Sequence, residues 1–230
     1  MQPRFVGRLS VADAVTISNA ALGFLAAVAA TRDPSLAARL ILLGAVADGL
    51  DGVLARKLGS SAAGPYLDSL ADVASFGVAP ALTVAVVATD AWTFGTAPIR
   101  FALALLLPAA FVAMAVTRLG LYTAYDSDAD ETSGAPTTLA STILAAGILA
   151  GFVTPLVLVG LSGLLAVLMV TTVTYPDLHP QDALVMGVVQ VLAIAFTGRW
   201  GEVFAFAILF LALAYLLLGP RFYWRDSLSA

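Results

Sequence analysis

The sequence predicts an all-α membrane protein, a polytopic bundle of about eight transmembrane helices that forms one domain over residues 1–230. The first observation is composition: 60% of the residues are hydrophobic, only 11% are charged, and the mean hydropathy is +0.97. Soluble domains carry about 25% charged residues. The second observation is length, because most of the chain divides into apolar runs of about 20 residues, enough to cross a hydrocarbon layer of roughly 30 Å.

Proline, glycine and charge clusters mark the limits of the first four expected spans. A permanent first span is expected, because no short apolar stretch with a cleavage site stands alone before it. The spans and their limits are 11–31 before Arg32, 35–57 between Pro34 and Lys57, 66–89 between Pro65 and Asp90, and 98–122 from Pro98.

The same kinds of residue mark the limits of the last four expected spans. Their ranges are 137–152 after Pro136, 155–174 from Pro155 to Pro176, 183–198 after Asp182, and 202–218 before Gly219 and Pro220. The longest polar interruption is the stretch around 125–136, which contains an acidic cluster at 126–131. Its residues are expected to form a solvated loop.

Cysteine is absent, which excludes disulfides, thiolate metal sites and cysteine nucleophiles. The single histidine, His179, has no second ligand at metal-binding spacing and is expected to be an ordinary surface residue. Any bound metal should therefore have oxygen ligands.

Two pairs of carboxylates fall within expected spans, where ionisable groups are costly and usually functional. Asp48 and Asp51 lie roughly 60° apart on one helix face at about 100° per residue. Asp68 and Asp72 are four residues apart on the next helix and also share a face. The short connection 57–65 makes the two helices antiparallel neighbours, so the four acids are expected to converge on one site.

Four carboxylates in a low dielectric would repel one another unless cations neutralised them, and all-oxygen ligation favours Mg²⁺, Mn²⁺ or Ca²⁺. Two such ions could clamp the attacking and leaving oxygens of a phosphoryl transfer. Arg56 lies just past the acids and could hold a phosphate or anchor the helix at the interface. The acids therefore predict a metal-dependent phosphoryl transferase.

The pattern around these acids resembles the signature of the CDP-alcohol phosphatidyltransferase family. The matching residues stand in the family's order: Asp48, Asp51, Gly52, Ala55, Arg56, Gly64, Asp68 and Asp72. The usual motif has eight residues between its arginine and second glycine, whereas 57–63 supplies seven. The difference falls in a connection, where length is best tolerated.

The resemblance implies a six-helix catalytic core, membership of a homodimer and a set of site residues. It implies that all four aspartates hold the metals and that Asp72 is also the general base. Contacts to the CDP-lipid are implied for Gly52, Ala55, Arg56 and Gly64. Asn19, in the first span, resembles a position that faces the nucleotide, but it could equally bond a neighbouring helix.

Other segments are similar to the phosphatidylserine synthase branch of this family. They are the run 68–80 with Phe76, Gly77 and Pro80, the turn 134–136, and the run 168–176. Arg118 matches an arginine of that branch and could bind a serine carboxylate, or could anchor its helix at the interface. Acidic residues at 126–131 and a single lysine, Lys57, resemble haloarchaeal archaetidylserine synthases, whose donor is CDP-archaeol.

The predicted reaction transfers a lipid phosphate from CDP-archaeol or CDP-diacylglycerol to L-serine and releases CMP. Two alternatives stay open: the same chemistry with glycerol 3-phosphate or inositol phosphate as acceptor, and a cation-coupled membrane transporter that uses the acids as an ion path. The positive-inside rule applied to Arg4 and Arg8 places both termini and the connection 57–65 in the cytoplasm. The expected location is the cell membrane, with the active site facing the cytoplasm.

Overall fold

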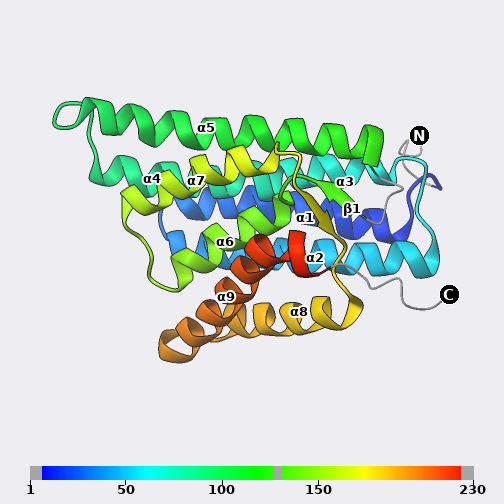
Figure 1. Cartoon of the computed structure of the whole chain (residues 1–230). Helices are drawn as coiled ribbons and strands as arrows, with labels where there is room; N and C mark the ends of the chain where they lie inside the picture. The colour runs from blue at the N-terminus through cyan, green and yellow to red at the C-terminus, as the bar shows by residue number, and fades with distance from the viewer. Residues whose placement is uncertain (1–6, 127–130, 224–230) are drawn as a thin grey trace.

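The computed structural model describes residues 7–126 and 131–223. Figure 1 shows that nearly all of this part of the chain is helical, which confirms the predicted all-α fold. Arg4 and most of the expected acidic loop at 126–131 lie outside the described residues.

The helices follow the expected spans closely. They are α1 (Val11–Ala30), α2 (Pro34–Leu58), α3 (Gly64–Asp72) continued through the π-helix η1 (Val73–Val78) into α4 (Ala79–Ala91), α5 (Pro98–Leu121) continued by the π-helix η2 (Tyr122–Asp126), α6 (Thr137–Leu149), α7 (Pro155–Met169), α8 (Pro180–Ala195) and α9 (Gly198–Phe222). Proline occupies the first turn of several of these helices, where its missing N–H costs nothing.

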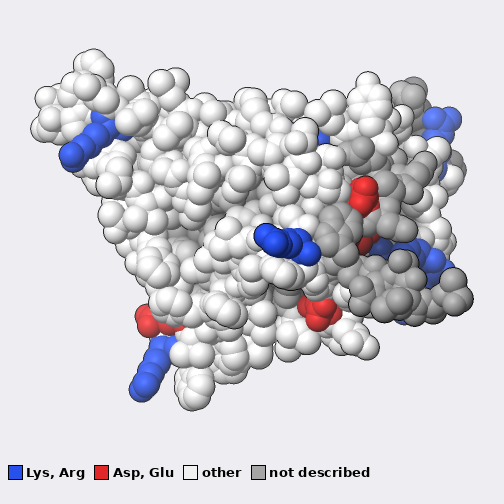
Figure 2. Space-filling model, in the orientation of Figure 1, with Lys and Arg blue, Asp and Glu red and all other residues white. Residues whose placement is uncertain are grey.

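Four of the described helical segments are long and apolar enough to cross a membrane, namely 11–30, 64–91, 98–125 and 198–222. Helix α2 also has 25 residues, but it is not one of these four segments. It carries several charged residues, among them Asp48, Asp51 and Arg56. Helices α6, α7 and α8 are apolar but shorter. In the view of Figure 2, most of the surface is uncharged, and the charged side chains form a few separate groups at the left, near the centre and at the right. This is the surface expected of an integral membrane protein.

Small residues allow the helices around the acids to approach closely. Helix α1 packs along α2 and also contacts α3, η1 and α4. A Cβ at Gly23 of α1 would lie 2.7 Å from the backbone of Ser75 in η1. A Cβ at Gly44 of α2 would lie 2.8 Å from the side-chain oxygen of Asn19. These two glycines therefore fix how near α1 lies to α2 and to η1.

The π-helix η1 begins directly after Asp72 and interrupts a continuous helical rod. Its last bond runs from the Ala79 N–H to the Ala74 carbonyl, five residues earlier. Pro80 follows and has no N–H to bond four residues back. The proline thus accounts for the wider turn at this point, and such turns are frequent at functional sites.

Two short strands, β1 (Glu131–Ser133) and β2 (Thr174–Pro176), form an antiparallel pair in which Thr132 lies opposite Tyr175. In Figure 1 the pair lies toward the same end of the bundle as α3. The sequence analysis expected no strands; residues 131–133 belonged to a polar loop and residue 174 to a span. The pairing needs two segments about forty residues apart, which local pattern does not reveal.

Candidate active site

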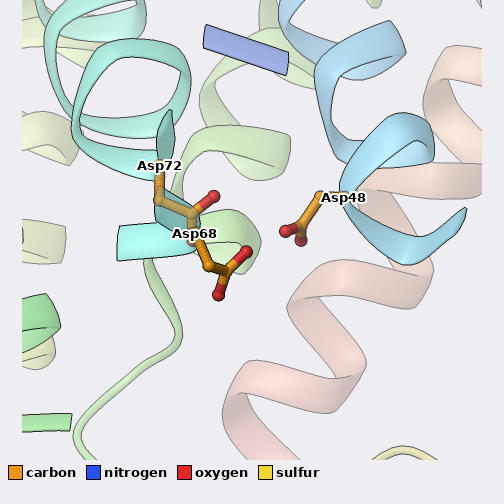
Figure 3. Close-up of side chains that lie close together, drawn as sticks. All are labelled: Asp48, Asp68 and Asp72. Atoms are coloured by element: carbon orange, nitrogen blue, oxygen red, sulfur yellow. The ribbon is translucent and has the colours of Figure 1, made fainter. Parts of the chain in front are cut away.

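Three carboxylates from two helices meet at one point. Asp48 projects from α2, and Asp68 and Asp72 project from α3 (Figure 3). Each contributes an oxygen, and these oxygens all lie within 4.8 Å of one another. The predicted convergence of the two helices is therefore confirmed for these three acids, and Figure 1 shows α2 and α3 running in opposite directions.

Asp51, the fourth predicted acid, is 6% exposed and lies one turn beyond Asp48 on α2. Its carboxylate accepts a hydrogen bond of 2.6 Å from the hydroxyl of Thr16 on α1. The sequence analysis missed Thr16. Its position three residues before Asn19 on the same helix was the available signal, because that spacing places both on one face.

A pocket of about 230 Å³ opens beside Asp51 and Asp68. Four elements line it: the first turns of α1, the end of α2, the start of α3 and η2. The lining residues are Ala12, Asp13, Thr16, Asp51, Gly52, Ala55, Ser60, Gly64, Pro65, Asp68, Tyr122 and Thr123. Three of the predicted CDP-lipid-binding residues, Gly52, Ala55 and Gly64, are therefore brought to one pocket. Arg56 is exposed, and its Nη1 lies 3.6 Å from the position of a Cβ on Gly52, at the edge of this pocket.

Gly64 begins α3 against the first turn of α1. A Cβ on Gly64 would lie 3.2 Å from Oδ1 of Asp13. Asp13 in turn accepts a 2.6 Å bond from the Ser10 N–H and donates its own N–H to the Ser10 hydroxyl, so it closes the capping box of α1. The connection 57–63, one residue shorter than the usual motif, still delivers Gly64 to the pocket.

Asn19 is fully buried among α1, α2 and η1 and is not among the pocket-lining residues. Its main-chain carbonyl accepts a 2.7 Å bond from the Ser75 hydroxyl. Neither polar atom of its side chain has a hydrogen-bond partner among the described residues. The side chain of Asn19 therefore makes neither expected contact among the described residues: it forms no hydrogen bond to a neighbouring helix, and it does not line the pocket.

Arg118 lies near the end of α5 and is only 8% exposed. Its Nη2 donates a 3.0 Å hydrogen bond to the Thr132 hydroxyl, and its guanidinium carbon lies 5.7 Å from the ring centre of Tyr122. Helix α5, which carries Arg118, contacts α3, which carries Asp68 and Asp72. A buried position beside the acids does not fit an anchor at the membrane surface.

Comparisons with a family pattern and with individual proteins point to the same family. The sequence pattern of the family CDP-alcohol phosphatidyltransferase matches residues 9–175. The chain is 29% identical over 180 residues to the archaetidylserine synthase of Methanothermobacter thermautotrophicus, which covers 76% of this chain and 73% of that protein.

Shorter matches involve enzymes named CDP-diacylglycerol-serine O-phosphatidyltransferase. The one from Mycobacterium leprae is 42% identical over 80 residues, 34% of this chain and 25% of that protein. The one from Methanocaldococcus jannaschii is 43% identical over 74 residues, 32% of this chain and 34% of that protein. Because the family pattern spans most of the chain, including every acid of the site, this integral membrane protein belongs to the CDP-alcohol phosphatidyltransferase family of phospholipid-synthesising transferases.

Proposed function

We propose that this enzyme transfers the lipid phosphate of CDP-archaeol or CDP-diacylglycerol to L-serine, producing archaetidylserine or phosphatidylserine and CMP. The observation that carries the proposal is a carboxylate cluster, Asp48, Asp68 and Asp72, beside a buried arginine, Arg118. The names of the relatives, an archaetidylserine synthase and two serine phosphatidyltransferases, support serine as the acceptor.

The acids fit a divalent metal site, and we propose two Mg²⁺ or Mn²⁺ ions held by Asp48, Asp51, Asp68 and Asp72. Carboxylate oxygens are the ligands these ions prefer. Oδ1 of Asp72 is buried without a hydrogen-bond partner, a costly arrangement that a cation would relieve. When bound, the metal would neutralise charge that develops on the phosphate oxygens during transfer.

Asp72 is the proposed general base, because it belongs to the carboxylate cluster and the family resemblance gives this role to its position. It takes the proton of the serine hydroxyl, and the serine oxygen attacks the lipid-linked phosphorus. A new bond forms from that oxygen to phosphorus as the bond between the two phosphates breaks. CMP carries away the electron pair.

The pocket at the ends of α1, α2 and α3 is the proposed site for the CDP part of the donor. Gly52, Ala55 and Gly64 present little side-chain bulk there, so a phosphate could approach the helix backbone closely. Arg56 at its edge supplies a positive charge for a phosphate. Asn19 lies deeper, and we propose that it supports this wall of the site by filling the space between helices.

Arg118 is the proposed partner of the serine carboxylate, because a guanidinium can bind a carboxylate through two parallel hydrogen bonds. Among the described residues it is the one arginine or lysine that is buried. Glycerol 3-phosphate or inositol phosphate would bring a second phosphate into a site rich in carboxylates, which one guanidinium would balance poorly. The arrangement therefore favours serine over these acceptors.

We further propose a location in the cell membrane with the site facing the cytoplasm, and a homodimeric assembly. Arg8 lies just before α1, and Arg56 and Lys57 lie at the end of α2, so these positive charges flank segments that line the pocket. This supports the orientation by the positive-inside rule. The homodimer follows from the family resemblance.

The test is CMP release by purified protein in detergent, with CDP-archaeol or CDP-diacylglycerol as donor and Mg²⁺ or Mn²⁺ present. L-serine, glycerol 3-phosphate and inositol phosphate are compared as acceptors. We expect serine-dependent release that stops with a chelator, returns with the metal, and falls by a factor on the order of 10²–10⁴ in Asp72→Asn. Release with another acceptor would overturn the serine assignment, and no release with any acceptor would favour the transporter.

A further inference from the structure

The guanidinium of Arg118 contacts residues of two other elements. Its Nη2 donates to the hydroxyl of Thr132, which is 9% exposed and lies in the middle of β1. The ring of Tyr122, in η2, lies 5.7 Å from the guanidinium carbon. The hydrogen bond joins two segments that are 14 residues apart and separated by the polar stretch between η2 and β1. Arg118, on α5, is therefore bonded by a residue of strand β1.

Strand β1 is itself fixed to the ends of other elements. Gly134, directly after β1, has φ of +78°, and a Cβ there would lie 2.1 Å from the Met169 carbonyl oxygen at the end of α7. The Gly134 and Ala135 N–H groups donate to the carbonyls of Val173 and Leu168 at 2.8 and 3.0 Å. The position of Thr132 is thus set by the end of α7 and the segment that follows it.

The partner strand β2 carries this attachment onward to α9. Thr132 pairs with Tyr175, whose hydroxyl donates a 3.1 Å bond to the Leu216 carbonyl. The hydroxyl of Tyr215 donates a 2.5 Å bond to the Pro176 carbonyl. Residues 215 and 216 lie beyond the part of the chain that the family pattern matches, 9–175. A helix outside that matched region therefore supports the sheet that touches Arg118.

We infer that Thr132 is a positioning residue for the acceptor: its hydroxyl, held by the β1–β2 pair, orients the Arg118 guanidinium toward the carboxylate of the incoming amino acid. The inference rests on the proposed serine-transferring function. A guanidinium binds a carboxylate well only when its planar set of donors is presented at the right angle. A fixed hydroxyl on one amino group limits rotation of that plane, so less freedom is lost when the acceptor binds.

The experiment compares Thr132→Val, which removes the hydroxyl and keeps a β-branched side chain, with Thr132→Ser, which restores the hydroxyl. Thr174→Val, in the neighbouring strand, controls for the loss of a hydroxyl from the sheet. We expect Thr132→Val to raise the KM for serine roughly tenfold, since hydrogen bonds to charged groups are worth about that much. The kcat at saturating serine and the KM for the CDP-lipid should change less than twofold, and Thr132→Ser and Thr174→Val should resemble the wild type.

Each other result decides against the inference in a distinct way. An unchanged KM for serine in Thr132→Val, with an active wild type, overturns the positioning role and leaves the proposed function intact. A lower kcat together with higher KM values for both substrates in Thr132→Val, not restored in Thr132→Ser, shows a merely structural role. That result also overturns the inference. A wild type that releases CMP only with another acceptor overturns the serine assignment and this inference together.

Discussion

Gly23 faces the backbone of Ser75, and this single missing side chain brings α1 against the π-helix that follows Asp72. The close approach allows the Ser75 hydroxyl to bond the Asn19 carbonyl. The same face of α1 carries Thr16, which holds Asp51. At the scale of single residues, the acids are therefore positioned by small and hydroxyl-bearing neighbours on α1.

Gly23→Ala should lower the free energy of unfolding by about 1–3 kcal/mol, the range for adding a methyl group to a well-packed interior. The added Cβ would meet backbone atoms of Ser75 at 2.7 Å, and backbone cannot rotate away. Thermal unfolding in detergent measures the effect.

Gly187→Ala is the matched control, because a Cβ at that position in α8 meets nothing within 4 Å. It should leave stability unchanged or raise it by up to about 1 kcal/mol through better helix propensity. Equal behaviour of the two variants would contradict the role assigned to Gly23.

Among elements, α8 is attached to α2, the helix that carries Asp48 and Asp51, through hydrogen bonds from two polar side chains. Nη1 of Arg39 donates to the carbonyls of Ala193, Ile194 and Phe196 at the carboxyl end of α8. Gln190 donates a 2.8 Å bond to the Leu42 carbonyl. The positive charge of Arg39 at the carboxyl end of α8 also interacts favourably with the dipole of that helix. The helix that carries half of the acids is thereby braced by a helix outside the family-matched region.

Arg39→Met should therefore lower the free energy of unfolding by about 1.5–3 kcal/mol, because the carbonyls at the end of α8 lose a charged hydrogen-bond donor. Activity measured well below the unfolding temperature should persist, since Arg39 is not among the pocket-lining residues. Arg32→Met, at an exposed arginine in the turn before α2, is the control. Thermal unfolding measures the stability of both variants. An equal loss of stability in the two would argue against a specific attachment of α8.

For the whole molecule, the orientation in the membrane decides which compartment supplies serine. In Figure 1, α1 begins, α2 ends and α3 begins at the same end of the bundle, so the pocket opens at that end. Lys57, the single lysine of the sequence, is exposed at the end of α2, directly before the connection to α3. Its amine is therefore a natural reporter of the side on which the site lies.

A membrane-impermeant amine reagent should label Lys57 in inside-out vesicles and leave it unlabelled in right-side-out vesicles. Peptide mapping by mass spectrometry identifies the modified residue and separates it from the amino terminus. Lys57→Arg should abolish the signal from that peptide. Labelling of Lys57 from the outside alone would place the site on the other face and contradict the proposed orientation.

The helical fold was predictable in detail because apolar composition and segment length identify such helices in a sequence. Each expected span coincides with a helix, or with the rod α3–η1–α4, to within a few residues. Helical periodicity also predicted that Asp48, Asp51, Asp68 and Asp72 would converge, and the structure brings Asp48, Asp68 and Asp72 together. The strands β1 and β2 and the π-helix η1 were not predicted, because the first depends on pairing of distant segments and the second on a single proline within an apolar run.

The sequence by itself determined the all-α membrane fold and the acids of the site, since hydropathy and helical spacing are local properties of the chain. Of the roughly eight spans expected, four described helical segments are long and apolar enough to cross a membrane. Only the tertiary structure decided what surrounds those acids. It bonded Thr16 to Asp51, buried Asn19 between helices, and bonded Arg118 to Thr132. Such contacts arise where residues far apart in the chain are packed together, and a low dielectric makes each of them count more than it would in water.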